Sequence, residues 1–228
     1  MAMQQRLLLL SLARIAVGCA GILAGLLFAA RTLNWPNAWW FSGILLTALV
    51  VSALHLARVN PEIFVARRRI GAGTKGWDRV MIVLIGLGFT AIIWIAGFDH
   101  RWQWGLLPDW LAAVGYILLL AGVVIITLAQ AVNRHFEPTV RLQSDRAHAV
   151  IDSGPYAIVR HPGYAGGLLI VVGMGLALGS GWAFVGVVAT LAVLAIRTVL
   201  EERTLHDGLT GYTAYTQRVR YRWVPGVW

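Results

Sequence analysis

Charged residues are scarce in this sequence. Of its 228 residues, 13% are charged and 58% are hydrophobic, whereas an average soluble domain has roughly 25% charged residues. A soluble domain of this length could not cover its surface with so few charges. The composition therefore excludes an ordinary soluble fold and favours a protein that exposes apolar surface to lipid.

Cysteine and acidic residues are also few. Cys19 is the only cysteine, so the chain offers no internal disulfide and no cysteine-based metal site, and we expect no metal. Ten acidic residues stand against 19 lysines and arginines, a net charge of +9. In a soluble protein this excess would suggest nucleic-acid binding. Here the placement of the charges explains it better, and we expect no nucleic-acid partner.

Long apolar runs are abundant. Because the ~30 Å hydrocarbon core takes roughly 20 apolar residues to cross, four runs qualify: Leu7–Ala30, Ala38–Ala57, Val80–Phe98 and Leu111–Val132. A fifth block, Tyr164–Ile196, is broken at Gly179-Ser180-Gly181 and reads as two shorter spans or a hairpin. The sequence predicts an all-α integral membrane protein with about six transmembrane helices, or five plus a helical hairpin, and a cytoplasmic C-terminal segment.

Basic residues gather in alternate loops. Arginines and lysines cluster in 58–79 (Arg67-Arg68-Arg69 among them), 134–160 and 197–222, whereas the loops between carry only Arg31 and Arg101. Most tryptophans, such as Trp40 and Trp104, fall near the weakly charged loops. Positively charged loops stay in the cytoplasm, and tryptophan favours the membrane interface. We therefore expect a multi-pass protein with both termini in the cytoplasm.

Polar chemistry is concentrated late in the chain. Residues 1–132 read as transmembrane spans of generic type, whereas 133–228 hold two polar segments that flank the broken block. The first of these segments carries His135, His148 and His161. Ionisable residues grouped beside membrane spans are functional candidates, so we expect the functional core in 133–228.

Three motifs in this part stand out. The first is Gly154-Pro155-Tyr156, followed by Arg160-His161-Pro162-Gly163-Tyr164 and Gly166-Gly167. Pro162 favours an extended His161 and can begin the next helix at its first position.

The second motif places Arg197 and Glu201 four residues apart, on one helix face. The third is the tail, where tyrosine and arginine alternate from Tyr212 to Arg222 and indicate a segment folded back onto the membrane face. Each motif alone could be an interfacial anchor.

In this order the motifs resemble the isoprenylcysteine carboxyl methyltransferase family, with its phospholipid methyltransferase relatives. The resemblance covers roughly 133–228. It implies an S-adenosylmethionine cofactor at the cytoplasmic face and a lipid-like substrate that enters from the bilayer. It also implies cofactor contacts from His148, Val150, Ile151, Tyr156, His161, Pro162, Gly163, Tyr164 and Glu201. Arg197 matches the arginine that faces the substrate and is the candidate catalytic residue.

The residue types suit that chemistry. A bound sulfonium favours aromatic faces and negative charge, which Tyr156, Tyr164 and Glu201 supply. A carboxylate acceptor needs no general base, and Arg197 could hold it by a two-pronged contact. An amine or phenol acceptor would need a base, with His161 or His148 as candidates.

Two departures from the family pattern concern the substrate. Gly211 stands where an acidic residue usually precedes the first tail tyrosine, and the ending from Val219 to Trp228 differs from the prenylcysteine enzymes. Two alternatives stay open. One is a sterol-type membrane reductase using a nicotinamide dinucleotide, which has a similar Arg-His-Pro-x-Tyr segment. The other is a non-enzymatic scaffold or transporter.

Overall fold

The protein is described by a computed structural model that covers residues 2–66, 73–143 and 146–228. The cluster Arg67-Arg68-Arg69 lies outside the described residues. The elements are α1 (Ala2–Ala30), α2 (Pro36–Val59), α3 (Glu62–Ala66), α4 (Gly76–Trp102), α5 (Trp110–Val132), η3 (Gly154–Ala157), α6 (Pro162–Ala177), α7 (Phe184–Gly208) and α8 (Tyr212–Arg218). Every apolar run expected from the sequence forms a helix, so the predicted all-α fold is confirmed.

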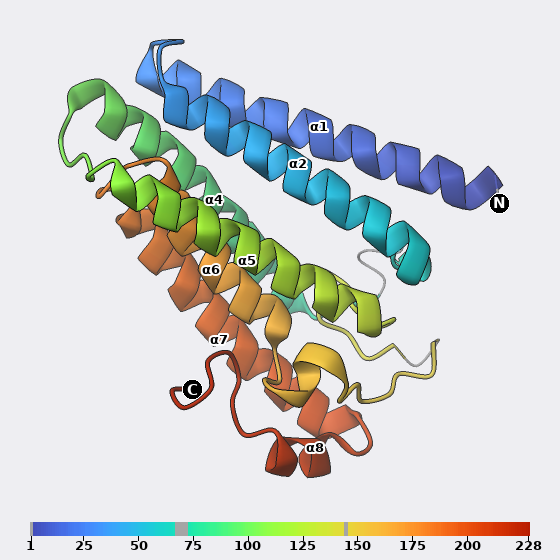
Figure 1. Ribbon diagram of the computed structural model, residues 1–228. Helices are drawn as coiled ribbons and strands as arrows, with labels where there is room; N and C mark the ends of the chain where they lie inside the picture. The colour runs from blue at the N-terminus through green and yellow to red at the C-terminus, as the bar shows by residue number, and fades with distance from the viewer. Residues whose placement is uncertain (1, 67–72, 144–145) are drawn as a thin grey trace.

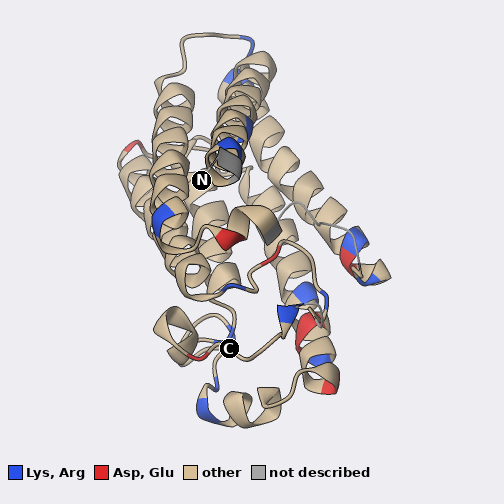
Figure 2. Cartoon of the chain, turned by 90° about the vertical axis from the view of Figure 1, so that its right-hand side faces the viewer, with Lys and Arg blue, Asp and Glu red and all other residues tan. Residues whose placement is uncertain are grey.

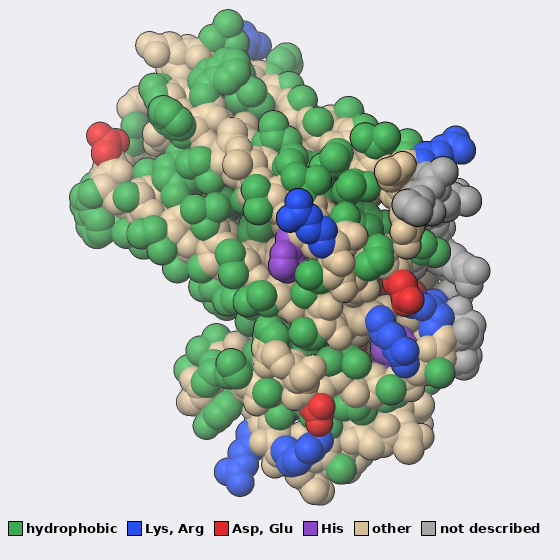
Figure 3. Space-filling view, turned by 45° about the vertical axis from the view of Figure 1, so that its right-hand side comes forward, with side chains coloured by type: hydrophobic (Ala, Val, Ile, Leu, Met, Phe, Trp, Pro, Cys, Tyr) green, Lys and Arg blue, Asp and Glu red, His purple; other side chains and the backbone are tan. Residues whose placement is uncertain are grey.

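The long helices have the length and the surface of membrane spans. Five of the described helices (α1, α2, α4, α5 and α7) are long and apolar enough to cross a bilayer. Their outward faces carry large apolar side chains such as Val17, Ile117 and Val188, which are 73%, 67% and 64% exposed. The sides of the bundle are accordingly hydrophobic (Figure 3). Apolar surface of this extent requires lipid around it, and the chain is a multi-pass integral membrane protein.

The hairpin predicted at the broken block has unequal arms. α6 has 16 residues, or about 24 Å at 1.5 Å per residue, which is shorter than the ~30 Å hydrocarbon core. α7 has 25 residues and continues past the apolar run to Gly208. Gly179 makes the turn between them with a φ of +71°, in the left-handed region that glycine enters without steric cost.

The helices pack as two groups. α1 and α2 run side by side across one side of the molecule, and α4, α5, α6 and α7 form the rest of the bundle (Figure 1). α1 also packs on α4, and α2 on α5. The core at their meeting contains fully buried side chains from most helices, including Leu26, Phe41, Ile92, Leu119 and Val171.

Glycines bring α5 and α6 into very close contact. A Cβ at Gly122 would lie 2.5 Å from the carbonyl oxygen of Gly166, and one at Gly173 would lie 2.7 Å from that of Gly115. Helices approach this closely only where small residues line the seam. The seam holds the start of α6, and with it the Arg-His-Pro motif, against α5.

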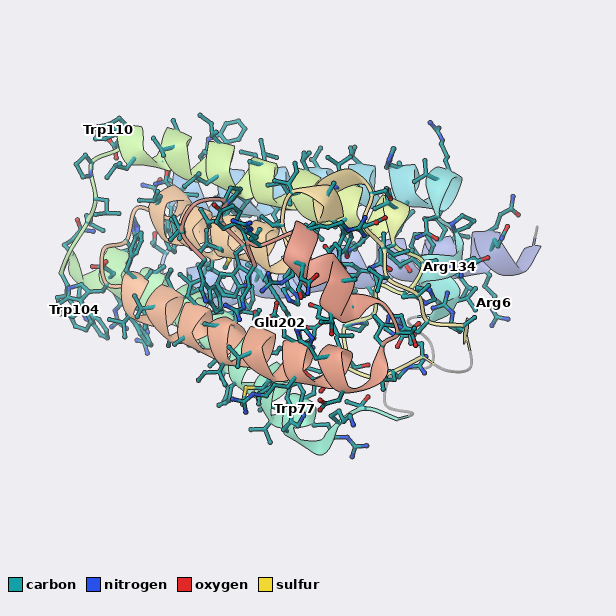
Figure 4. The ribbon with its side chains drawn as sticks, turned by 90° about the horizontal axis from the view of Figure 1, so that it is seen from below. Arg6, Trp77, Trp104, Trp110, Arg134 and Glu202 are labelled. Carbon is teal, nitrogen blue, oxygen red and sulfur yellow. The ribbon has the colours of Figure 1, made fainter. Side chains whose placement is uncertain are left out.

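The two ends of the bundle differ in polarity. Trp104 and Trp110 lie at one end, while Arg6 and Arg134 lie at the other (Figure 4). Charged residues gather around the end that holds α8 and the C-terminus, and the long helices above it are mostly uncharged (Figure 2). The polar segment after α5, the start of α6 and the C-terminal tail thus meet at the basic end.

Candidate active site

A cavity of about 230 Å³ lies at the basic end of the bundle. Its walls come from the polar segment after α5, from η3, from the first turn of α6, from α7 and from α8. Nine of the ten residues singled out from the sequence line it: His148, Val150, Ile151, Tyr156, His161, Gly163, Tyr164, Arg197 and Glu201. The tenth, Pro162, does not line it. Pro162 instead begins α6 at its first position and so sets the direction of the helix that carries Gly163 and Tyr164.

α6 begins at Pro162, as predicted, whereas the ψ of His161 lies outside the extended region that was expected. His161 precedes the helix with φ −125° and ψ 65°, and its carbonyl accepts the first hydrogen bonds of α6 from Tyr164 and Ala165. Gly163 leaves room for Phe136, whose ring would lie 3.0 Å from a Cβ at this position. The entrance is therefore packed against the polar segment that forms the opposite wall of the cavity.

Tyr164 and Glu201 join α6 to α7 inside the cavity. The Tyr164 hydroxyl donates to Glu201 Oε2 over 2.5 Å. In the described part of the chain, Glu201 Oε1 has no hydrogen-bond donor and the carboxylate forms no ion pair, although Arg197 acts on it at longer range. Glu201 thus offers a carboxylate oxygen to a ligand.

Arg197 is paired differently from the expectation. Its Nε donates to Asp78 Oδ1 over 2.7 Å and its Nη2 to Asp78 Oδ2 over 3.3 Å. Nη2 also donates to the Pro138 carbonyl over 2.7 Å. The two-pronged edge expected to hold a substrate carboxylate is therefore occupied by Asp78. Nη1 is the nitrogen left for a ligand, since it has no acceptor among the described residues.

Glu202 forms the centre of an ion-pair cluster behind the cavity. Arg160 Nε donates to its Oε1 over 2.5 Å, and Arg222 Nε donates to its Oε2 over 2.7 Å. The His161 Nε2 lies 3.3 Å from Oε1. Glu202 is 5% exposed and does not line the cavity. Its role is to fix the α6 entrance and the tail to α7.

The C-terminal tail is folded back against the α6 entrance and α7. The backbone N–H groups of Arg160 and His161 donate to the carbonyls of Tyr221 and Arg222. Trp223 Nε1 donates to Thr198 Oγ1 of α7 over 3.0 Å. The tail thereby closes the side of the α6 entrance that faces away from α5.

Two histidines line the polar wall. The backbone N–H of Gln143 donates to His148 Nδ1 over 3.4 Å, and the rings of His135 and His148 lie 4.8 Å apart. Burial, reinforced by His135 and two nearby arginines, lowers the pKa of His148 from 6.5 to about 4. Burial likewise lowers the pKa of His135. His148 is therefore neutral at physiological pH and a weak base.

Two buried hydroxyls that line the cavity lack partners. Thr139 Oγ1 and Tyr212 Oη have no hydrogen-bond partner in the described part of the chain. Burial raises the pKa of Tyr212, and nearby Glu202 and Glu201 raise it further, so its phenol stays protonated and remains a donor. Buried polar atoms are almost always satisfied, so both hydroxyls are available to hydrogen-bond a polar ligand or water in the cavity.

Comparisons with known proteins concern mainly the part of the chain that carries the cavity. Residues 110–208 match the model of a family described as "Phospholipid methyltransferase". The match lies in the C-terminal part of the chain and covers less than half of its length. The matched residues begin with α5 and end with α7, so they include the glycine seam and the residues of the cavity that lie on α6 and α7.

Two plant proteins resemble the same part. The chain is 31% identical over 97 residues to a probable protein-S-isoprenylcysteine O-methyltransferase of Oryza sativa subsp. indica. It is 27% identical over 101 residues to protein-S-isoprenylcysteine O-methyltransferase A of Arabidopsis thaliana. These matches take in 40% and 44% of this chain. They span about half the length of each relative, 51% and 48%.

The fold also resembles a solved structure. A eukaryotic intramembrane Ras methyltransferase, isoprenylcysteine carboxyl methyltransferase, superposes with a TM-score of 0.55 over 93% of this chain and 75% of the other, at 20% identity. At this identity the likeness concerns the fold, and it extends beyond the family match to the N-terminal helices.

The sequence did not predict three features of the site: the ion pair of Asp78, the buried hydroxyl of Thr139, and the hydroxyl of Tyr212 as a donor without a partner among the described residues. Asp78 had one local signal, since it is an acidic residue just before an apolar run in a chain with ten acidic residues in all. Nothing local in the sequence marks Thr139, whose hydroxyl matters only because the fold buries it.

Proposed function

We propose that this protein is a membrane-embedded S-adenosylmethionine-dependent methyltransferase that acts on a lipid-like or prenylated acceptor, with a carboxylate as the methylated group. The observation that carries the proposal is one cavity that joins aromatic rings, the open carboxylate oxygen of Glu201 and two partnerless buried hydroxyls. In this proposal 133–228, with the helices α6 and α7, form the methyltransferase core, and 1–132 are transmembrane spans of generic type.

The lining of the cavity fits the proposed cofactor. Glu201 Oε1 and the hydroxyls of Thr139 and Tyr212 would take its amino and hydroxyl groups, and the rings of Tyr156 and Tyr164 would lie near its sulfonium. When bound, the cofactor supplies a methyl group that passes from its sulfonium sulfur to an acceptor oxygen, leaving a neutral thioether. The residues of the chain orient the two partners and exclude water.

The histidines favour an acceptor that needs no base. An efficient general base has a pKa near the working pH, whereas that of His148 is about 4. His161 is turned to Glu202. A carboxylate is already ionised at neutral pH, and Arg197 Nη1 is the cationic donor that could meet it. The names of the two plant relatives point to the same class of acceptor.

Calorimetry tests the cofactor. Purified protein is titrated with S-adenosylhomocysteine and, separately, with a reduced nicotinamide dinucleotide. The proposal expects saturable heat from the first ligand alone, and heat from the nicotinamide alone would instead support the reductase. Transfer of labelled methyl is then compared between a prenylcysteine with a free carboxylate and an amine phospholipid in vesicles. Methylation of the phospholipid alone would overturn the carboxylate acceptor.

We also propose that the basic end, with the cavity and both termini, faces the cytoplasm, because the positively charged loops lie there. In a Cys19→Ser background, single cysteines are placed at the exposed positions Leu33 and Val227, which are 74% and 79% exposed. A membrane-impermeant maleimide applied to intact cells should label L33C and not V227C. The reverse pattern would invert the topology.

A further inference from the structure

Asp78 is a buried carboxylate at the start of α4 that does not line the cavity. It is 0% exposed, and its Oδ2 also accepts the backbone N–H of Val140 over 2.7 Å. Burying a carboxylate is costly unless it is paired and hydrogen-bonded. Asp78 meets this condition through Arg197 of α7 and through the wall segment that carries Val140.

The contacts of Asp78 fix the orientation of the Arg197 guanidinium. The Nε hydrogen and the Nη2 hydrogens are engaged by Asp78 and Pro138. The guanidinium carbon lies 5.6 Å from the centre of the Tyr164 ring, and Tyr164 in turn holds Glu201. A chain of contacts therefore runs from Asp78 through Arg197 and Tyr164 to Glu201, and its last three members line the cavity.

Asp78 also balances the charge of the cavity. The cationic side chains that line it are paired with carboxylates: Arg141 with Glu137, Arg160 with Glu202, and Arg197 with Asp78. Glu137 and Glu202 are each shared by a second arginine, Arg146 and Arg222, whereas Asp78 serves Arg197 alone among the described residues. Glu201 is the lining carboxylate that forms no ion pair in the described part of the chain, and it places its negative charge beside the ring of Tyr164, an arrangement that suits a cation.

We propose that Asp78 is a positioning residue that neutralises Arg197 and turns its Nη1 to the cavity, so that Arg197 does not offset the negative charge of Glu201 that favours a sulfonium. This inference rests on the proposed function. Without the Asp78 charge, Arg197 would stand unbalanced beside the sulfonium position. The site would then lose its preference for the positively charged cofactor over the uncharged product.

The test compares two ligands that differ by one methyl group and one positive charge. The Kd values of S-adenosylmethionine and S-adenosylhomocysteine are measured for the wild type and for Asp78→Asn. The ratio compared between the two proteins is the Kd of S-adenosylmethionine divided by the Kd of S-adenosylhomocysteine. Loss of one negative charge near the sulfonium should raise the ratio about three- to tenfold. A purely structural role would weaken both ligands equally and leave the ratio unchanged.

Asp99 provides a matched control on the same helix. It is also an aspartate of α4 with 0% exposure, but it lies at the other end, where Ser180 Oγ donates to it over 2.6 Å and the Gly105 N–H over 2.7 Å. Asp99→Asn should lower stability and leave the ratio unchanged. An equal rise in both variants would overturn the proposal.

Two further variants test the proposal if Asp78→Asn does not fold. Asp78→Glu keeps the charge but displaces Arg197, and should keep the wild-type ratio while kcat for methyl transfer falls. The double variant Asp78→Asn/Arg197→Met removes both charges and should return the ratio to near the wild-type value. An unchanged kcat in the first or a raised ratio in the second contradicts the proposal. If the wild type binds neither ligand, the proposed function fails instead.

Discussion

The hydroxyl of Tyr164 donates to Glu201 across the junction of α6 and α7, with 2.5 Å between Oη and Oε2. The bond holds one carboxylate oxygen in place and leaves the other facing the cavity. Two helices that are adjacent in the chain thus present a single, oriented acceptor group.

Glu201→Gln should weaken binding of S-adenosylhomocysteine by roughly ten- to a hundredfold, because hydrogen bonds to an ionised group contribute about 1.5–3 kcal/mol. Tyr164→Phe, which only frees the carboxylate, should cost roughly three- to tenfold. Calorimetry measures both. Tyr221→Phe is the control, since Tyr221 is 39% exposed and lies outside the cavity. Normal binding by Glu201→Gln would remove this residue from the site.

Glu202→Gln should release the C-terminal tail. Removing the charge between Arg160 and Arg222 leaves two partly buried guanidinium groups without a counter-ion, at a cost of about 3 kcal/mol. We expect a lower melting temperature in detergent and faster cleavage by trypsin after the tail arginines. Asp207→Asn, an exposed position on the same helix, should behave as the wild type. Equal trypsin sensitivity of the two variants would contradict the role assigned to Glu202.

Gly122→Ala should destabilise the protein by about 1–3 kcal/mol, because its Cβ would overlap the Gly166 carbonyl and force α5 away from α6. Gly86→Ala is the matched control, since nothing lies within 4 Å of the Cβ it would add to α4. Thermal unfolding in detergent compares the two. The seam has no special importance if both variants melt at the same temperature.

Acid should destabilise the wall that carries His148. Its pKa is about 4 in the folded protein and about 6.5 when unfolded, so the unfolded chain binds more protons between these values. Stability should therefore be unaffected above pH 6.5 and fall as the pH drops from 6.5 towards 4. His148→Gln should show a shallower fall over this range in thermal unfolding. The same slope in both proteins would assign the pH dependence to other groups.

The sequence predicted the helices well because an apolar run long enough to cross the bilayer must form a helix there. It also predicted most of the cavity, because His161, Tyr164, Arg197 and Glu201 belong to compact motifs whose helix positions follow from local rules. The start of α6 at Pro162 is one such case.

What escaped prediction depends on distant contacts. Asp78 and Arg197 are 119 residues apart, and no local pattern pairs them. Glu201 and Glu202 are neighbours in the chain but point in different directions on α7, so only the packed tail decides that one lines the cavity and the other binds arginines. The partnerless hydroxyls of Thr139 and Tyr212 likewise follow from burial alone.

α4 is anchored at both ends by a fully buried aspartate. Asp78 binds α7 at the basic end, and Asp99 binds Ser180 in the turn between α6 and α7 at the other. These two contacts tie α4 to α7 at the basic end and to the turn that precedes α7 at the other. In the proposed function, ligand entry and product release would then fall to the segments at the basic end that are not tied down in this way, the polar stretch after α5 and the folded-back tail.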